Sequence, residues 1–208
     1  MLRPAILWNA GRCAEECQLL EDKVSASRQI TGNLMMPGFT APKLLWVQRH
    51  EAAVFSQVDK VLLPKDYLRL RMTGELASDM SDAAGTMWLD VARRDWSDEM
   101  LAACDLSRDA MPALFEGSDV TGQLRPEVAQ AWNMPPALVV GGGGDNAAGA
   151  VGVGMADAGQ AMLSLGTSGV YFAVSEGFLS KPESAVNSFC HALPGRWHLM
   201  SVMLSAAS

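Results

Sequence analysis

Residues 135–154 read PPALVVGGGGDNAAGAVGVG, and the order of elements in this stretch decides the fold class. The apolar residues 137–140 predict a short strand that runs directly into four consecutive glycines. Glycine has no side chain, so another group can approach the backbone of this turn closely. Asp145 and Asn146 follow at once, which places an acid and an amide where the strand ends.

The spacing around Asp145 leaves two roles open. A carboxylate at a strand end can accept a proton from a substrate hydroxyl, while Asn146 orients that substrate. Asp and Asn are also favoured as N-caps, so the pair can simply begin a helix. No lysine follows the glycines, which excludes a Walker A loop. A dinucleotide-binding turn is disfavoured, because Asp145 would lie where the pyrophosphate belongs.

A second glycine turn lies at 163–169, LSLGTSG, between two apolar segments. The pattern predicts a hairpin whose tip carries Thr167 and Ser168. Backbone N–H groups and hydroxyls at such a tip can bind phosphate oxygens, although an ordinary tight hairpin has the same pattern. Two such turns near a domain boundary favour a site between domains.

Composition limits the class of protein. The 208 residues are 49% hydrophobic, and 23 acidic residues face 16 basic ones. This balance argues against nucleic-acid binding, and no apolar stretch is long enough to span a bilayer. The N-terminus lacks a signal-peptide layout, so we expect a cytoplasmic protein whose Cys13, Cys17, Cys104 and Cys190 are reduced.

Periodicity predicts alternating strands and helices first and paired strands later, which is the α/β class. The expected strands and hairpins are 2–8, 60–63, 87–90, 137–140, 160–178 and 188–204. The expected helices are 13–24, one from near Lys43, one ending at Gly74, one after Ser97 and 125–134. Residues 78–86 and 105–124 are expected to form loops, and a domain boundary is expected at 152–160.

Several polar and aromatic residues have structural interpretations. Asp79 and Asp82 are expected to be solvated or to cap a turn rather than to bind a metal. Lys43 is expected on the surface at a helix start, and His191 is expected to be a buried strand histidine. The core prediction includes four tryptophans, Trp8, Trp46, Trp88 and Trp132.

Six segments are together specific for one family: AILWNAGRC, TGNLMMPGFTAPKLLWV, LLPKDYLRLRMTGE, SDMSDAAGTMWLDV, GGGDNAAGAVGVG and LSLGTSGVYFAVSE. In this order they resemble the FGGY carbohydrate kinases, in particular the bacterial members that act on D-xylulose. The resemblance implies the actin-like, ribonuclease-H-like two-domain ATPase fold. It also implies a sugar-binding FGGY domain over 1–155 and the beginning of an ATP-binding domain over 156–208, with substrates in the cleft between them.

The resemblance also implies the chemistry. The reaction would be phosphoryl transfer from ATP, with Mg²⁺, to the 5-hydroxyl of D-xylulose. Asp145 falls on the catalytic base of the family and Asn146 on a sugar-contacting position. Gly166, Thr167 and Ser168 fall on the ATP phosphate-binding turn. The expected partners are therefore a sugar and ATP. A homodimer is possible.

Three departures from the family pattern bear on activity. The D-x-G-T-[ST] phosphate loop and the Q-M-H-G sugar motif do not occur, and Ala10 replaces an Asp of the W-N-D-G-R segment. We therefore expect an internal fragment that lacks the first strands of one domain and most of the other. The alternative to an active kinase is an inactive remnant or a sugar-binding module of the same family.

Overall fold

The computed structural model describes residues 1–207 and shows a mixture of helices and strands, as the α/β prediction requires. The α-helices are α1 (Ala14–Lys23), α2 (Ser27–Thr31), α3 (Thr40–His50), α4 (Ala52–Phe55), α5 (Pro64–Thr73), α6 (Met80–Ala84), α7 (Asp98–Ala102), α8 (Pro126–Ala131) and α9 (Asp145–Gly152). The strands are β1 (Ala77–Asp79), β2 (Leu89–Asp90), β3 (Asp95–Trp96), β4 (Ala113–Phe115), β5 (Val120–Gln123), β6 (Leu138–Val140), β7 (Ala161–Leu165), β8 (Gly169–Ser175), β9 (Asn187–Cys190) and β10 (Trp197–Met203). Within the described residues no helix is long and apolar enough to cross a membrane.

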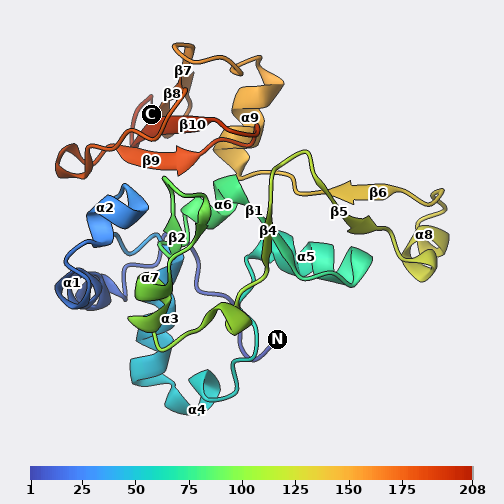
Figure 1. Cartoon of the computed structure of the whole chain (residues 1–208), viewed down its shortest axis with the longest axis horizontal. Coiled ribbons are helices and arrows are strands. Elements are labelled where there is room, and N and C mark those ends of the chain that lie inside the picture. Colours follow the sequence, from blue (N-terminus) through green and yellow to red (C-terminus); the bar gives the residue numbers. More distant parts are fainter. Residues whose placement is uncertain (208) are drawn as a thin grey trace.

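The elements form a helical body with an antiparallel sheet on one side and a projecting ribbon (Figure 1). The sheet has the order β7-β8-β10-β9, and the ribbon is the β5–β6 pair with α8 at its end. Inside the body, β1 pairs in parallel with β4, and β2 pairs antiparallel with β3. The two hairpins expected after residue 160 are therefore confirmed, and β8 and β10 join them into one sheet.

Local sequence signals explain where several helices begin and end. Pro64 and Pro126 occupy the first turns of α5 and α8, where a missing N–H costs nothing. Gly74 ends α5 in the left-handed conformation, with φ +89°. Ser97 caps α7 by accepting a hydrogen bond from the Met100 N–H at 3.3 Å. These helices are confirmed.

The main core lies in the helical body and extends into the sheet. Trp88, Leu20 and Met100 are fully buried there, and Phe189 and Cys190 of β9 belong to the same cluster. A smaller cluster joins Ala150 of α9 to β8. The sheet that follows residue 160 is thus packed against elements that precede it. All four cysteines are free and buried, as predicted.

Three predictions near the N-terminus are wrong. Residues 2–8 form no strand, because no described strand lies alongside to complete their backbone hydrogen bonds, and Trp8 is 66% exposed. The helix expected to begin near Lys43 is present as α3, which begins at Thr40, but Lys43 is not on the surface. The Lys43 ammonium is buried, where it donates hydrogen bonds to the carbonyl oxygens of Pro37, Gly38 and Phe39.

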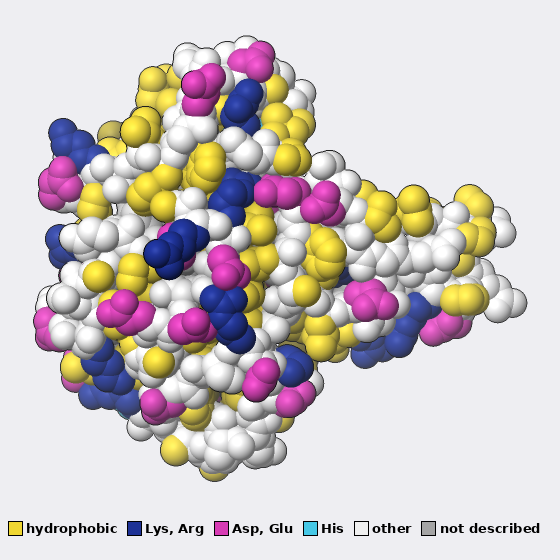
Figure 2. Space-filling view, viewed as in Figure 1, with side chains coloured by type: hydrophobic (Ala, Val, Ile, Leu, Met, Phe, Trp, Pro, Cys, Tyr) yellow, Lys and Arg dark blue, Asp and Glu magenta, His cyan; other side chains and the backbone are white. Residues whose placement is uncertain are grey.

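Three more predictions fail farther along the chain. Residues 60–63 form no strand, and the expected loop at 105–124 contains β4 and β5, whose partners β1 and β6 are distant in sequence. Trp132 is half exposed on the projecting ribbon, whereas Trp88 is buried as expected. Hydrophobic side chains line this ribbon (Figure 2), including Val120, Leu138 and Val140.

Two buried histidines pack against aromatic side chains of the sheet. His198 of β10 stacks on Phe172 with ring centroids 4.1 Å apart, and His191 lies 5.8 Å from His198, one residue beyond β9. His191 is buried, as predicted. Burial, aided by His191, lowers the pKa of His198 to about 3.

We predict that protonation of His198 destabilises the protein in acid. Its folded pKa lies below the ordinary value of 6.5, so its contribution to stability is complete above about pH 6.5 and is lost as the pH falls toward 3. Urea unfolding from pH 7 to pH 4 should show a shallower loss for His198→Phe than for the unchanged chain. Equal slopes for His198→Phe and for the unchanged chain would contradict the assignment.

Candidate active site

Asp145 is the first residue of α9 and lies directly after the glycine turn that ends β6. Its side chain is exposed, and its Oδ1 accepts hydrogen bonds from the Asn146 N–H at 2.8 Å and from Asn146 Nδ2 at 3.1 Å. The pair does begin a helix, as one alternative expects, but the N-cap position is Gly144 rather than Asp145. The structure therefore presents an accessible carboxylate whose orientation is fixed by the neighbouring amide.

Two glycines of the turn, Gly141 and Gly143, are required by neighbouring parts of the same chain. A Cβ on Gly141 would collide with the carbonyl oxygen of Glu116. A Cβ on Gly143 would lie 2.9 Å from Ala192 Cβ and 3.3 Å from Ser81 Oγ. The groups that approach these two glycines are thus segments of the protein itself, which hold the turn in place.

Four hydrogen bonds fix the backbone of the turn, one of them from the Gly141 N–H to the carbonyl oxygen of Asp119 at 2.9 Å. The Gly142 N–H donates to the carbonyl oxygen of Gly117 at 2.8 Å, and the Gly144 N–H donates to Ser81 Oγ at 2.9 Å. The buried guanidinium of Arg69 donates to the Gly141 carbonyl oxygen. The loop that carries Asp145 is therefore attached to the body on both sides of its glycines.

A network of charges lies beside the turn, with Asp66 and Asp79 buried and Lys65 and Asp82 partly exposed, and no local sequence pattern predicts it. Lys65 Nζ is 2.5 Å from Asp79 Oδ2, 3.0 Å from Asp66 Oδ1 and 3.7 Å from Asp82 Oδ2. Asp79 also accepts hydrogen bonds from the N–H groups of Ser81 and Asp82 and so caps α6. The capping prediction for Asp79 is confirmed, but this carboxylate is buried rather than solvated.

Asp82 is the member of this network that lies closest to the turn. A Cβ on Gly144 would lie 3.6 Å from Asp82 Oδ1. Burial raises the pKa of Asp82 to about 6; Lys65 opposes this shift, whereas the carboxylates of Asp79, Asp66 and Asp145 add to it. Burial lowers the pKa of Lys65, but the surrounding carboxylates outweigh it and leave that pKa above its ordinary value.

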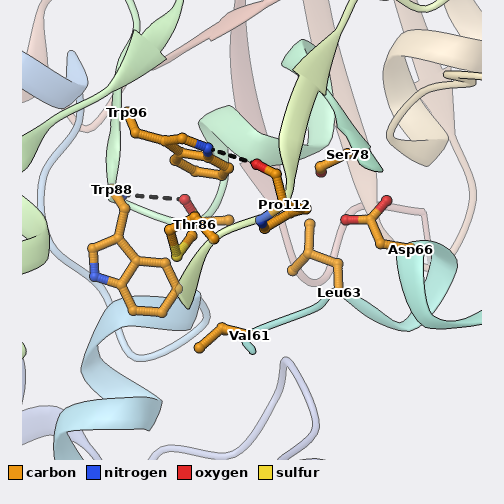
Figure 3. A pocket seen from close by; sticks show the side chains of 9 residues that line it. Val61, Leu63, Asp66, Ser78, Thr86, Trp88, Trp96 and Pro112 are labelled. Atoms are coloured by element: carbon orange, nitrogen blue, oxygen red, sulfur yellow. Dashed lines mark hydrogen bonds between the residues drawn. The ribbon is translucent and has the colours of Figure 1, made fainter. Parts of the chain in front are cut away.

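The pocket in Figure 3 lies on the other side of this network. Asp66 and Ser78 line it together with Trp88 and Pro112, and Trp96 Nε1 donates to the Pro112 carbonyl oxygen across its rim. Its volume of about 10 Å³ accommodates one water molecule and is far below that of a sugar site. This cavity is therefore not a candidate for substrate binding.

The second predicted site is the β7–β8 hairpin tip. Gly166, Thr167 and Ser168 are exposed there, and the Gly166 N–H donates to the Ser168 carbonyl oxygen at 2.9 Å. Within residues 1–207, neither hydroxyl makes a hydrogen bond and none joins this tip to Asp145. The two predicted sites thus lie on separate elements, Asp145 at the start of α9 and the Gly166–Ser168 tip between β7 and β8.

Metal ligands are not concentrated in the described part of the chain. No group of three or more His, Cys, Asp or Glu side chains there could hold a metal ion by itself. Asp79 is occupied by Lys65 and by the N-terminus of α6. Protein-bound Mg²⁺ commonly relies on one or two carboxylates together with the substrate's phosphates, and the exposed Asp145 carboxylate is of this kind.

Comparison with known proteins now defines the class. Residues 1–152 match the N-terminal domain of the FGGY family of carbohydrate kinases. The fold is similar to a xyloylose kinase from Brucella ovis, with a TM-score of 0.95 and 56% identity over 99% of this chain and 42% of that one. It is also similar to the xylulose kinase from Rhodospirillum rubrum, with a TM-score of 0.90 and 28% identity over 98% of this chain and 42% of that one. The expected actin-like, ribonuclease-H-like ATPase fold is confirmed.

The chain belongs to the FGGY family of carbohydrate kinases. It is 97% identical to the xylulose kinase of Klebsiella pneumoniae and 83% identical to that of Escherichia coli K12, in each case over all 208 residues. Those 208 residues cover 43% of each relative, so the chain spans less than half of their length.

We predict that Asp82→Asn stabilises the protein near neutral pH. The folded pKa of Asp82 is raised above its ordinary 3.8, so ionisation of this group opposes folding above about pH 6 and has no such effect below pH 4. The melting temperature of Asp82→Asn should exceed that of the unchanged chain at pH 8, and the difference should vanish at pH 4.

The control is Asp157→Asn, which changes an exposed acid in the loop between α9 and β7. It should leave the melting temperature unchanged at both pH values. A lower melting temperature for Asp82→Asn at pH 8 would show that the carboxylate is stabilising there and would contradict the prediction.

Proposed function

We propose that this chain provides the catalytic base for ATP-dependent phosphorylation of D-xylulose to D-xylulose 5-phosphate. The observation that carries the proposal is the exposed Asp145 carboxylate on a turn whose backbone is fixed by Arg69, Gly117 and Ser81. The 97% identity to the K. pneumoniae xylulose kinase supports the choice of sugar.

Asp145 would accept the proton of the attacking 5-hydroxyl as the phosphoryl group is transferred. A general base must lie within hydrogen-bond reach of its proton, which requires an accessible carboxylate held in one orientation. The Asn146 side chain already contacts the carboxylate at 3.1 Å, so the same amide can orient the sugar beside it. These two residues therefore combine proton transfer with substrate positioning.

The Gly166–Ser168 tip would bind the phosphates of ATP. Its exposed hydroxyls and the adjacent turn backbone suit an anion, since N–H and O–H donors can converge on phosphate oxygens. When bound, Mg²⁺ supplies charge neutralisation for the transferred phosphoryl group. In this chain Asp145 is the accessible carboxylate of the candidate site that could contact such an ion directly or through water.

The organisation around this chemistry follows the family. We propose that residues 1–155 belong to the sugar-binding FGGY domain and that 156–208 begin the ATP-binding domain. A cytoplasmic location and a homodimer complete the proposal.

We predict that Asp145→Asn lowers kcat by about 100- to 10,000-fold, the usual range for loss of a general base. The test uses the K. pneumoniae xylulose kinase with its matching 208 residues replaced by this chain; we call this protein the host enzyme. The amide keeps the shape of the carboxylate, so the KM values for D-xylulose and ATP and the melting temperature should change little. The measurement is ADP release in the presence of D-xylulose.

Asp157→Asn in the host enzyme is the control, because it removes an exposed acid outside the turn and should keep full activity. Near-normal turnover of Asp145→Asn would remove Asp145 from the base role. A host enzyme that binds D-xylulose without releasing ADP would instead favour the alternative of a sugar-binding module.

A further inference from the structure

We infer that Ser81 is a positioning residue for the Asp145 carboxylate and acts through the Gly144 N–H. The inference rests on the proposed function, in which Asp145 accepts the proton of the sugar hydroxyl. It adds a residue that touches no substrate but determines where the base lies.

The neighbours of the Ser81 hydroxyl determine which hydrogen bond it donates and which it accepts. It donates its proton to Asp79 Oδ1 at 2.5 Å, and its oxygen accepts the Gly144 N–H at 2.9 Å. Since Asp79 is an acceptor and the backbone N–H a donor, the hydroxyl can take one orientation only. The side chain is 7% exposed, so water competes little for either bond.

Asp79 makes the Ser81 oxygen a better acceptor. Its carboxylate is fully buried, and Lys65 Nζ holds its other oxygen at 2.5 Å. A hydroxyl that donates to a buried carboxylate is polarised, which strengthens the hydrogen bond it accepts. A continuous chain of contacts therefore runs from Lys65 through Asp79 and Ser81 to the backbone of Gly144.

Gly144 is the residue immediately before Asp145 and forms the N-cap of α9. Its N–H bond to Ser81 fixes the peptide plane between Gly143 and Gly144, one peptide before Asp145. The next peptide is held by the Gly144 carbonyl oxygen, which accepts the Ala148 N–H at 2.8 Å, so the bond to Ser81 restrains the backbone from which Asp145 projects. Gly143 has no Cβ, which leaves the approach of Ser81 Oγ to the turn open. Loss of the hydroxyl would free this plane, although Arg69 and Gly117 still hold Gly141 and Gly142.

The first experiment compares Ser81→Ala with Ser78→Ala in the host enzyme. Ser78 is also buried and lies in the same segment, but its hydroxyl has no hydrogen-bond partner within residues 1–207. Ser81→Ala should lower kcat by about 10- to 100-fold, the scale of a small misplacement of a catalytic group, and leave both KM values within about threefold. Ser78→Ala should keep kcat, and Ser81→Thr, which retains the hydroxyl, should restore most of it. An unchanged kcat for Ser81→Ala would overturn the inference.

A double-mutant cycle separates this inference from the proposed function. If Ser81 acts through Asp145, Ser81→Ala should have little further effect once Asp145→Asn has removed the base. A loss of the same factor in both backgrounds would overturn the positioning role while leaving the base assignment intact. Normal turnover of Asp145→Asn alone would instead remove the proposed function.

A third measurement requires no turnover, and its first part uses only the unchanged host enzyme. Amide hydrogen exchange of the unchanged host enzyme should show a protected Gly144 N–H, and the Ser81→Ala protein should exchange it at least about tenfold faster. Rapid exchange of Gly144 in the unchanged enzyme would overturn the inference even if Ser81→Ala failed to fold.

Discussion

The attachment of one glycine turn to the body of the protein is the constraint on which the candidate site depends. Gly141 and Gly143 meet the backbone of Glu116 and the side chains of Ser81 and Ala192 so closely that a methyl group would collide. A turn of four glycines would be mobile by itself, since glycine restricts the backbone least. Here the absence of side chains has the opposite effect, because it allows close packing that fixes the turn.

The packing joins parts of the chain that are distant in sequence. Ser81 follows β1, Glu116 follows β4, and Ala192 follows β9, and all of them contact the turn between β6 and α9. The buried ion pairs of Lys65 support the α6 side of this junction. Burial of a carboxylate without a partner costs free energy. An arrangement of α5, β1 and α6 that separated Lys65 from Asp66 and Asp79 would therefore be less stable. The exposed Asp145 carboxylate is thus carried by a backbone segment that is held in one position. A general base needs such a fixed position, because it must lie within hydrogen-bond reach of the proton it accepts.

Sequence patterns predicted where the proposed base, Asp145, lies, but not the contacts that hold its turn. The strand–glycine–acid order placed Asp145 at the start of α9, and Pro64, Gly74 and Ser97 marked helix ends correctly. These features are local, so spacing alone can predict them. The expected loop at 78–86 instead contains β1 and α6, because the pairing of β1 with β4 and the capping by Asp79 override its polar composition.

The contacts of Lys65 and Ser81 could not be predicted, since they depend on that tertiary arrangement. One local signal was available, because an Asp followed by a short helix-forming segment is typical of an N-cap. Leu138 and Val140 show a different limit, because they lie in a predicted strand but are exposed. Their apolar run predicts a strand correctly, but burial depends on what packs against the strand, which composition does not report.

The most direct test of the central claim is a crystal structure of the host enzyme with D-xylulose and a non-hydrolysable ATP analogue. If Asp145 is the base, one of its carboxylate oxygens should lie about 2.6–3.2 Å from the 5-hydroxyl oxygen, with the terminal phosphate on the opposite side of that oxygen. A 5-hydroxyl that contacts a different acid, with Asp145 directed away from the sugar, would contradict the account.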